Sequence, residues 1–198
     1  MASNLAGEMS FYESARQEVA AKRAIARRLV AEVQKGEALL MGWGSTVLAV
    51  AEELLTSQRR DVTVFTNSIP LASRIAASAP DAPQLVLLGG PLHWPSLASL
   101  PEEETLARLH VDKAVLSCTG ISAEYGWAAG SVALQTYHLM MAAARETWVV
   151  ADHTKISKRG LAIVGPIDEI HCLVTDRAEA EGLEAIRARG VRVLTPTQ

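Results

Sequence analysis

Short apolar runs recur along the chain and alternate with longer stretches in which apolar and polar residues follow helical spacing. The runs cover residues 38–41, 62–65, 85–88, 114–116, 148–150, 172–174 and 191–194. Each run has the length of a strand and is largely apolar, which is typical of parallel strands buried on both faces. The pattern therefore predicts a three-layer, Rossmann-like α/β fold, with a mainly parallel sheet of about six to seven strands covered by helices on both faces.

The N-terminal part of the chain is predicted to be a long helix behind a flexible tail. Residues 1–9 show no periodicity. Ser10 followed by Glu13 is typical of a capping box, and the stretch from there to about Gln34 keeps helical spacing until Gly36 closes it. Because we find no internal repeat, low-complexity segment or linker, we expect residues 10–198 to form a single domain.

Small, hydroxylic and glycine residues gather directly after five of the predicted strands. The carboxyl ends of parallel strands share one edge of a sheet, and ligands bind in the crevice outside that edge. Glycines let a ligand approach the backbone, hydroxyls donate hydrogen bonds, and helix N-termini offer free N–H groups to an anion. We therefore predict a site for a small anionic metabolite. Its residues are Gly42, Trp43, Gly44, Ser45, Thr46, Asn67, Ser68, Gly89, Gly90, Thr119, Gly120, Asp152 and Lys155.

Residues 42–46 contain the most informative of these loops. Its glycines and two hydroxyls suit a phosphate or a carboxylate. It is neither a P-loop, because no lysine follows at the required spacing, nor a dinucleotide fingerprint, because the third glycine is missing. Trp43 either stacks on a ligand or packs on its neighbours. Any one such loop is also typical of a helix cap or a turn, so the prediction depends on their recurrence at five strand ends.

Two charged residues follow the fifth predicted strand. Lys155 is either a point charge for a phosphate or carboxylate, or a solvated surface lysine. Asp152 either accepts a hydrogen bond from a sugar hydroxyl or caps a turn. Asp112 and Lys113, by contrast, precede the fourth strand at the opposite edge of the sheet, so we expect them to be structural.

Composition and charge exclude several classes of protein. The 198 residues are 49% hydrophobic and 21% charged, with a net charge of −3, which favours a full core and lacks the basic excess of a nucleic-acid-binding surface. The sequence contains no apolar run of membrane-spanning length and no secretory signal, which favours a cytoplasmic protein. Cys118 and Cys172 lie in apolar runs and are expected to be buried free thiols. The histidines show no metal-ligand spacing, and we expect no metal and no cofactor.

Several short motifs, in order and at similar spacing, resemble the C-terminal effector-sensing domain of the DeoR family of transcriptional regulators. The matching stretches are residues 22–26, 44–46, 64–68, 87–90, 109–114, 119–122, 151–155 and 174–176. The resemblance implies a fold like that of ribose-5-phosphate isomerase and the CoA-transferase-like enzymes. It also implies an effector-sensing and oligomerisation domain of a sugar-metabolism repressor, which is not an enzyme, forms a homo-oligomer and binds a phosphorylated sugar, a sugar acid or a similar metabolite.

Three positions depart from the family pattern. The family has an Asp-Ser pair where this chain has Gly42 and Trp43, and an acidic residue where it has Thr119. A Thr-Pro-Asn stretch is replaced by residues 128–131. The scaffold is kept while the polar recognition set is changed, which leaves a different or more apolar ligand, or none, as alternatives.

The resemblance also bears on partners. The family reads DNA through a winged helix that would precede this domain, so we expect DNA contact only through a domain not present in this chain. A ligand would act by favouring one arrangement of protomers. The alternatives are an enzyme of the sugar-phosphate isomerase or CoA-transferase-like superfamily and a ligand-free oligomerisation module. The enzyme is disfavoured because the loops are poor in carboxylates: Asp152 is the only one directly after a strand that we nominate, with Glu124 nearby.

Overall fold

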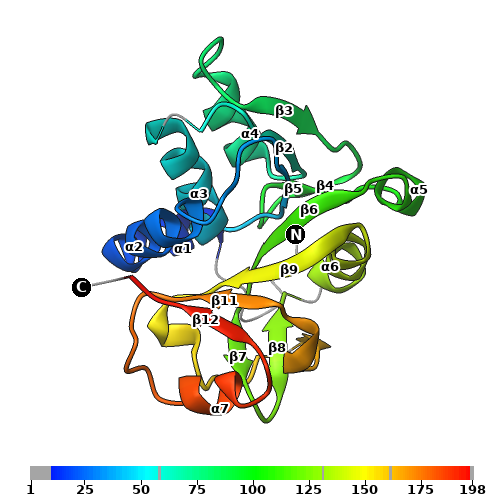
Figure 1. The fold of residues 1–198 in the computed structure, drawn as a ribbon. Helices are drawn as coiled ribbons and strands as arrows, with labels where there is room; N and C mark the ends of the chain where they lie inside the picture. The colour runs from blue at the N-terminus through cyan, green and yellow to red at the C-terminus, as the bar shows by residue number, and fades with distance from the viewer. Residues whose placement is uncertain (1–9, 58, 131, 161, 197–198) are drawn as a thin grey trace.

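The computed structural model describes residues 10–57, 59–130, 132–160 and 162–196, and a seven-stranded parallel sheet forms its centre (Figure 1). The strands lie in the order β12-β11-β9-β6-β1-β2-β3. They are β1 (Ala38–Met41), β2 (Thr63–Thr66), β3 (Gln84–Leu87), β6 (Val111–Ser117), β9 (Ala144–Val150), β11 (Cys172–Val174) and β12 (Arg192–Leu194). Each predicted apolar run overlaps one of these strands, so the predicted sheet is confirmed.

Alternate residues of the central strands enter two separate cores, which explains why the strands read as continuous apolar runs. On β1, Leu40 packs in one core, while Leu39 and Met41 pack in the other. The first core lies under α5, α6 and α7, and the second under α2, α3 and α4. The bounds are α2 (Val19–Val30), α3 (Ser45–Thr56), α4 (Ile69–Ala76), α5 (Glu103–Ala107), α6 (Ala133–Ala142) and α7 (Leu183–Arg187). Helices therefore cover both faces, as predicted.

The N-terminal helix is broken in two, contrary to the prediction of a single long helix. α1 (Phe11–Arg16) and α2 are joined by two residues, and the second of them, Glu18, has left-handed backbone angles of φ 47° and ψ 40°. The predicted capping box of Ser10 and Glu13 is present at the start of α1. The sequence pattern missed the break because neither glycine nor proline marks it; contacts with other elements, described below, override the helical periodicity.

Short strands form two additional antiparallel sheets, which the apolar pattern did not predict. Strands of two to four residues are too short to show a clear alternation. One sheet has the order β10-β8-β7, and β4 pairs with β5 in the other. Their bounds are β4 (Leu92–His93), β5 (Ala98–Ser99), β7 (Gly120–Ser122), β8 (Gly126–Ala129) and β10 (Ala162–Gly165). Two 3-10 turns, η1 (His153–Lys155) and η2 (Ile167–Glu169), complete the described elements.

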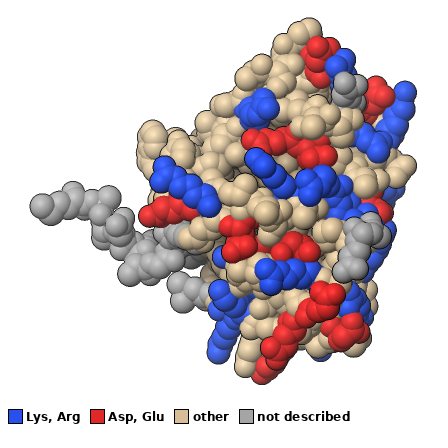
Figure 2. All heavy atoms as spheres, turned by 90° about the vertical axis from the view of Figure 1, so that its left-hand side faces the viewer, with Lys and Arg blue, Asp and Glu red and all other residues tan. Residues whose placement is uncertain are grey.

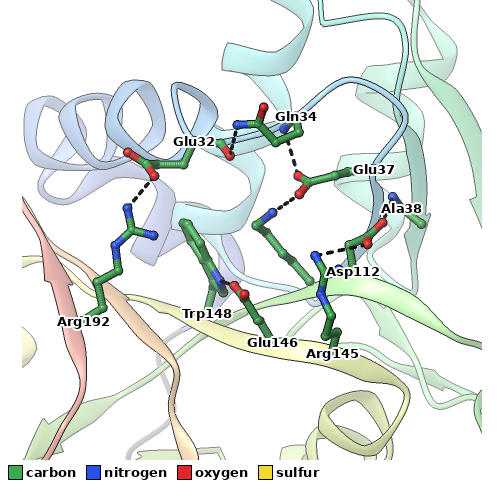
Figure 3. A network of polar contacts seen from close by, with 10 residues as sticks. Glu32, Gln34, Glu37, Ala38, Asp112, Arg145, Glu146, Trp148 and Arg192 are labelled. Atoms are coloured by element: carbon green, nitrogen blue, oxygen red, sulfur yellow. Dashed lines mark hydrogen bonds and ion pairs between the residues drawn. The ribbon is translucent and has the colours of Figure 1, made fainter.

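A network of polar contacts occupies the amino-terminal edge of the sheet (Figure 3). Lys113 is buried and pairs with Glu37, and its ammonium lies 5.3 Å from the ring centroid of Trp148. The Asp112 carboxylate accepts a hydrogen bond from the Ala38 N–H at 2.9 Å. These contacts join β6 to the start of β1, in keeping with the structural role expected of Asp112 and Lys113. Among the described residues, no helix is long and apolar enough to cross a membrane.

Candidate functional site

A cavity of about 350 Å³ lies at the carboxyl ends of β1, β6 and β9, which are neighbours in the sheet. Segments far apart in the sequence form its wall: α1, the start of α2, the β1–α3 loop, the loop between β4 and β5, the segment after β6, the end of β8, α6 and η1. Its volume suits a small metabolite. Of the predicted site residues, the structure brings together Trp43, Gly44, Ser45, Thr46, Thr119, Asp152 and Lys155.

The β1–α3 loop offers backbone N–H groups to this cavity. Gly44 has φ 119°, and a Cβ at this position would collide with the Ser117 hydroxyl, so the close approach of the loop to β6 requires glycine. The Ser117 hydroxyl donates to the carbonyl oxygen of Trp43 at 2.9 Å. The N–H groups in the first turn of a helix have no partner inside the helix, and α3 begins without a side chain that caps them. The N-terminus of this helix therefore suits an anion.

Lys22 contributes a buried cation that the sequence analysis did not select as a site residue. Its side chain lines the cavity, and the ammonium donates to the carbonyl oxygens of Ser14 and Gln17, each at 2.5 Å. Lys22 thereby holds the end of α1 against α2. Burial lowers the pKa of Lys22, the Asp152 carboxylate opposes this effect, and Lys155 adds to it.

The two charged residues predicted after β9 have different surroundings. Asp152 is buried and caps η1: its Oδ1 accepts hydrogen bonds from the N–H of Thr154 at 3.0 Å and from the Thr154 hydroxyl. Asp152 therefore caps a turn, one of its two predicted roles, while it also lines the cavity. Lys155 lies in η1, is half-buried and lines the cavity beside it.

Three aromatic rings form a column that ends at the cavity. The Trp127 and Tyr137 rings are buried and stacked, with centroids 5.8 Å apart and an interplanar angle of 18°. The Tyr137 and Trp43 centroids are 4.7 Å apart. A Cβ on Gly42 would lie 3.1 Å from Leu116 Cδ2, a tight contact, and 3.4 Å from the Tyr137 ring, an ordinary van der Waals contact. Gly42 is buried and, unlike Trp43, does not line the cavity.

The structure places Asn67 and Ser68 outside the cavity. Both are buried at the end of β2, where the β4–β5 hairpin covers them. Asn67 donates from Nδ2 to the carbonyl oxygen of Ser99 at 2.7 Å. Ser68 caps α4 by accepting from the N–H of Leu71. The sequence prediction used only the residues that follow each strand, and this pattern does not show that a hairpin covers the end of β2. Asn67 and Ser68 were therefore grouped with the cavity.

Three more predicted glycines also lie outside the cavity lining. Gly89 and Gly90 follow β3, the edge strand, and Gly90 has φ 139° where the chain passes the backbone of Leu100. Gly120 belongs to β7, and a Cβ there would meet the carbonyl oxygen of Lys158 at 2.6 Å. Gly90 and Gly120 therefore have structural reasons for glycine that do not involve the cavity, whereas a Cβ on Gly89 would meet nothing within 4 Å.

The buried nucleophiles near the cavity stay protonated. Desolvation raises the pKa of the Cys118 thiol to about 12, and it raises the pKa of Tyr137 further above its ordinary range. Neither group is activated at neutral pH. Among the described residues, no cluster of histidine, cysteine and carboxylate side chains could hold a metal ion.

Comparison with known proteins shows the family to which this chain is related. The DeoR C-terminal sensor domain matches residues 17–177. The lactose phosphotransferase system repressor of Staphylococcus aureus is 25% identical over 182 residues, which cover 91% of this chain and 71% of the repressor. The transcriptional repressor GlcR of Bacillus subtilis is 29% identical over 180 residues, which cover 89% of this chain and 68% of that protein.

Solved structures show the same fold at lower identity. A ribose 5-phosphate isomerase A from Methanocaldococcus jannaschii matches with a TM-score of 0.51 and 19% identity, over 70% of this chain and 54% of the isomerase. The Pyrococcus horikoshii translation initiation factor eIF-2B matches with a TM-score of 0.57 and 14% identity, over 80% of this chain and 63% of the factor. The fold and the family expected from the short motifs are therefore both confirmed, and the chain belongs to the DeoR C-terminal sensor domain family.

Proposed function

We propose that this chain senses an effector for a DeoR-type transcriptional regulator, and that the effector is a small organic anion bound in the cavity. One observation carries the proposal: two lysines and the uncapped N-terminus of α3 line the same small cavity. The relatives support a regulatory role, since those matched in Staphylococcus aureus and Bacillus subtilis are named as repressors.

The electrostatics of Lys22 favour an anionic ligand. Removing an ammonium from water costs free energy, and a phosphate or carboxylate beside it offsets that cost. Hydrogen bonds to charged groups contribute about 1.5–3 kcal/mol each. The backbone N–H groups at the start of α3 can also donate hydrogen bonds to the anion, without another charged side chain.

Contacts of α1 suggest how binding would be transmitted. The hydroxyls of Ser14 and Ser45 are 2.9 Å apart, so α1 meets the start of α3 at the cavity. The N–H of Phe11 donates to the carbonyl oxygen of Pro95 at 3.1 Å. An anion that binds Lys22 and the start of α3 would touch the groups that hold α1. We propose that the ligand selects one position of α1 and with it one arrangement of protomers.

The proposal includes self-association, a cytoplasmic location and DNA contact through a winged-helix domain outside residues 1–198. Acidic and basic side chains are interspersed on the face that carries α1 and α2 (Figure 2). Duplex DNA binding depends on many phosphate contacts from a basic surface, and this face does not offer one. Sequence-selective, submicromolar binding of duplex DNA by residues 1–198 alone would contradict this part.

A sugar-phosphate isomerase is the second candidate, favoured by the likeness to the fold of ribose 5-phosphate isomerase. Proton transfer during isomerisation needs a base with a pKa near the working pH. The carboxylates that line the cavity within the described residues are Glu18 and Asp152, and Asp152 is engaged in capping η1. Turnover of ribose 5-phosphate above background, in a coupled assay, would favour the enzyme over the sensor.

A thermal-shift screen of inorganic phosphate, sugar phosphates and sugar acids tests the proposed function. A ligand at 100 times its Kd stabilises the folded state by about 2.7 kcal/mol, so a true effector should raise the melting temperature clearly. Hits would then be titrated against the parent protein and Ser45→Ala. If no anion stabilises the protein, the proposed anion site is wrong.

A further inference from the structure

The aromatic column gives the cavity one rigid apolar wall. Trp43 is partly exposed and lines the cavity, while Tyr137 behind it is buried and stacked on Trp127. The carbonyl of Trp43 is fixed by the Ser117 hydroxyl, so both the backbone and the ring of Trp43 are supported. Other apolar lining residues include Phe11, Pro95, Ala129, Ala133, Val150 and Ala151. A supported aromatic ring loses little entropy when a flat ligand packs on it.

Three polar side chains of the lining already form hydrogen bonds within the protein. The hydroxyl protons of Ser117 and Thr119 go to the carbonyl oxygens of Trp43 and Ala128. The Asp152 Oδ1 already accepts two hydrogen bonds from Thr154. A ligand hydroxyl that is buried against the aromatic wall without a partner costs free energy, so a polyhydroxylated ligand is poorly matched to this wall.

The apolar wall and Lys22 come from opposite sides of the central sheet. Trp43 and Tyr137 pack in the core that lies under α6. Lys22 belongs to α2, which packs on the other core. A ligand that spans the carboxyl edge of the sheet would therefore meet positive charge at one end and an aromatic surface at the other.

We propose that the cavity selects an anion with a flat, apolar body, such as an aryl phosphate or aryl carboxylate, over a polyhydroxylated sugar phosphate. This inference rests on the proposed function, because it assumes the anion site formed by Lys22, Lys155 and the start of α3. It assigns to Trp43 the role of contacting the body of the ligand.

Calorimetric titration with phenyl phosphate, glucose 6-phosphate and inorganic phosphate tests the proposal on the parent protein. Phenyl phosphate should bind at least about tenfold more tightly than glucose 6-phosphate, because stacking adds to the burial of the ring. Glucose 6-phosphate binding as tightly as phenyl phosphate, or more tightly, would overturn the inference and leave the anion site intact. If none of the three binds, the anion site itself is wrong, and this inference falls with it.

Variants of Trp43 test whether this residue causes the preference for phenyl phosphate. Trp43→Ala should weaken phenyl phosphate about tenfold and inorganic phosphate less than about threefold, because inorganic phosphate has no body to stack. Trp94→Ala is the matched control, since Trp94 is 73% exposed and does not line the cavity. Trp43→Leu keeps most of the apolar volume and serves if Trp43→Ala does not fold. Equal losses for phenyl phosphate and inorganic phosphate would overturn the role assigned to Trp43.

Discussion

Two lysines are buried at opposite edges of the same sheet and are held in different ways. At the amino edge Lys113 is 5% exposed and pairs with the buried carboxylate of Glu37. At the carboxyl edge Lys22 is 6% exposed, and its ammonium donates to two backbone carbonyls. None of the ion pairs that the described residues form includes Lys22.

The difference separates a structural charge from a charge available to a ligand. A lysine neutralised by a buried carboxylate has its partner inside the protein. A lysine that donates only to backbone carbonyls can still bind an external anion. Burial lowers the pKa of Lys22, and an anion beside its ammonium would oppose this effect. Burial alone therefore does not identify the functional lysine; the identity of its partner does.

Lys113→Met should give the largest effect on stability. The substitution leaves the Glu37 carboxylate buried without its counter-charge, and breaking a buried pair in this way costs about 3–5 kcal/mol in the free energy of unfolding. Urea denaturation at neutral pH measures the loss. The double variant with Glu37→Leu should recover much of it, because no charge is then left unpaired. A loss below about 1 kcal/mol in the single variant would show that this ion pair is not the structural unit inferred here.

Unlike Lys113→Met, Lys22→Met should have a large effect on anion affinity and a smaller effect on the free energy of unfolding. Affinity for inorganic phosphate should fall at least about tenfold, because a charge-assisted hydrogen bond is lost. The free energy of unfolding should fall by less than about 2 kcal/mol, since the two carbonyls at the break before α2 lose a donor but no ion pair is broken. Calorimetry and urea denaturation measure the two quantities. An unchanged affinity, or a stability loss larger than that of Lys113→Met, would break the comparison.

Lys155→Ala extends the comparison to the second lysine of the cavity. We expect about tenfold weaker anion binding, with the fold intact. Lys158→Ala is the matched control, because Lys158 is exposed and does not line the cavity; its effect should stay below about twofold. If the two variants bind the anion equally well, Lys155 is a surface lysine, the alternative that the sequence left open.

The smallest expected effect is on the pH dependence of stability. The pKa of Lys22 is lower in the folded state than the ordinary value of 10.5, so the unfolded chain binds more protons between the lowered value and 10.5. Stability from this group should therefore rise with pH across that interval, and anion affinity should fall. The difference between the parent protein and Lys22→Met, in urea denaturation at several alkaline pH values, isolates the contribution. If the stability of the parent protein falls relative to Lys22→Met as the pH rises over this interval, the predicted direction is wrong.

The sequence predicted the sheet well because its strands are buried on both faces. Leu39, Leu40 and Met41 are apolar in succession, since alternate residues enter different cores, and such runs are hard to mistake. The break before α2 could not be predicted, because Gln17 and Glu18 carry no helix-breaking signal. The break is accompanied by hydrogen bonds from Lys22 to the carbonyl oxygens at the end of α1 and by the contact of Ser14 with Ser45, and a local pattern shows neither.

The sequence predicted cavity residues correctly only in loops that follow strands which are neighbours in the sheet. Residues after β1, β6 and β9 meet because those strands are neighbours, and Ser45, Thr119 and Lys155 accordingly share the cavity. The hairpin that covers Asn67 gave no signal. Lys22 fell within a stretch shared with the family, yet nothing local separates it from an exposed helical lysine. Its proximity to residues after β9 is a property of the packed structure.

The central claim is that Lys22 responds to an anion in the cavity while Lys113 does not. NMR titration of the parent protein, with ¹³C-labelled lysine side chains, measures the pKa of Lys22 with and without saturating inorganic phosphate and follows the Lys113 signal as an internal control. We predict that phosphate raises the pKa of Lys22, because an anion beside the ammonium favours its charged form, and leaves the chemical shift of the Lys113 side chain at neutral pH unchanged. A Lys22 pKa that is the same with and without phosphate would contradict the account.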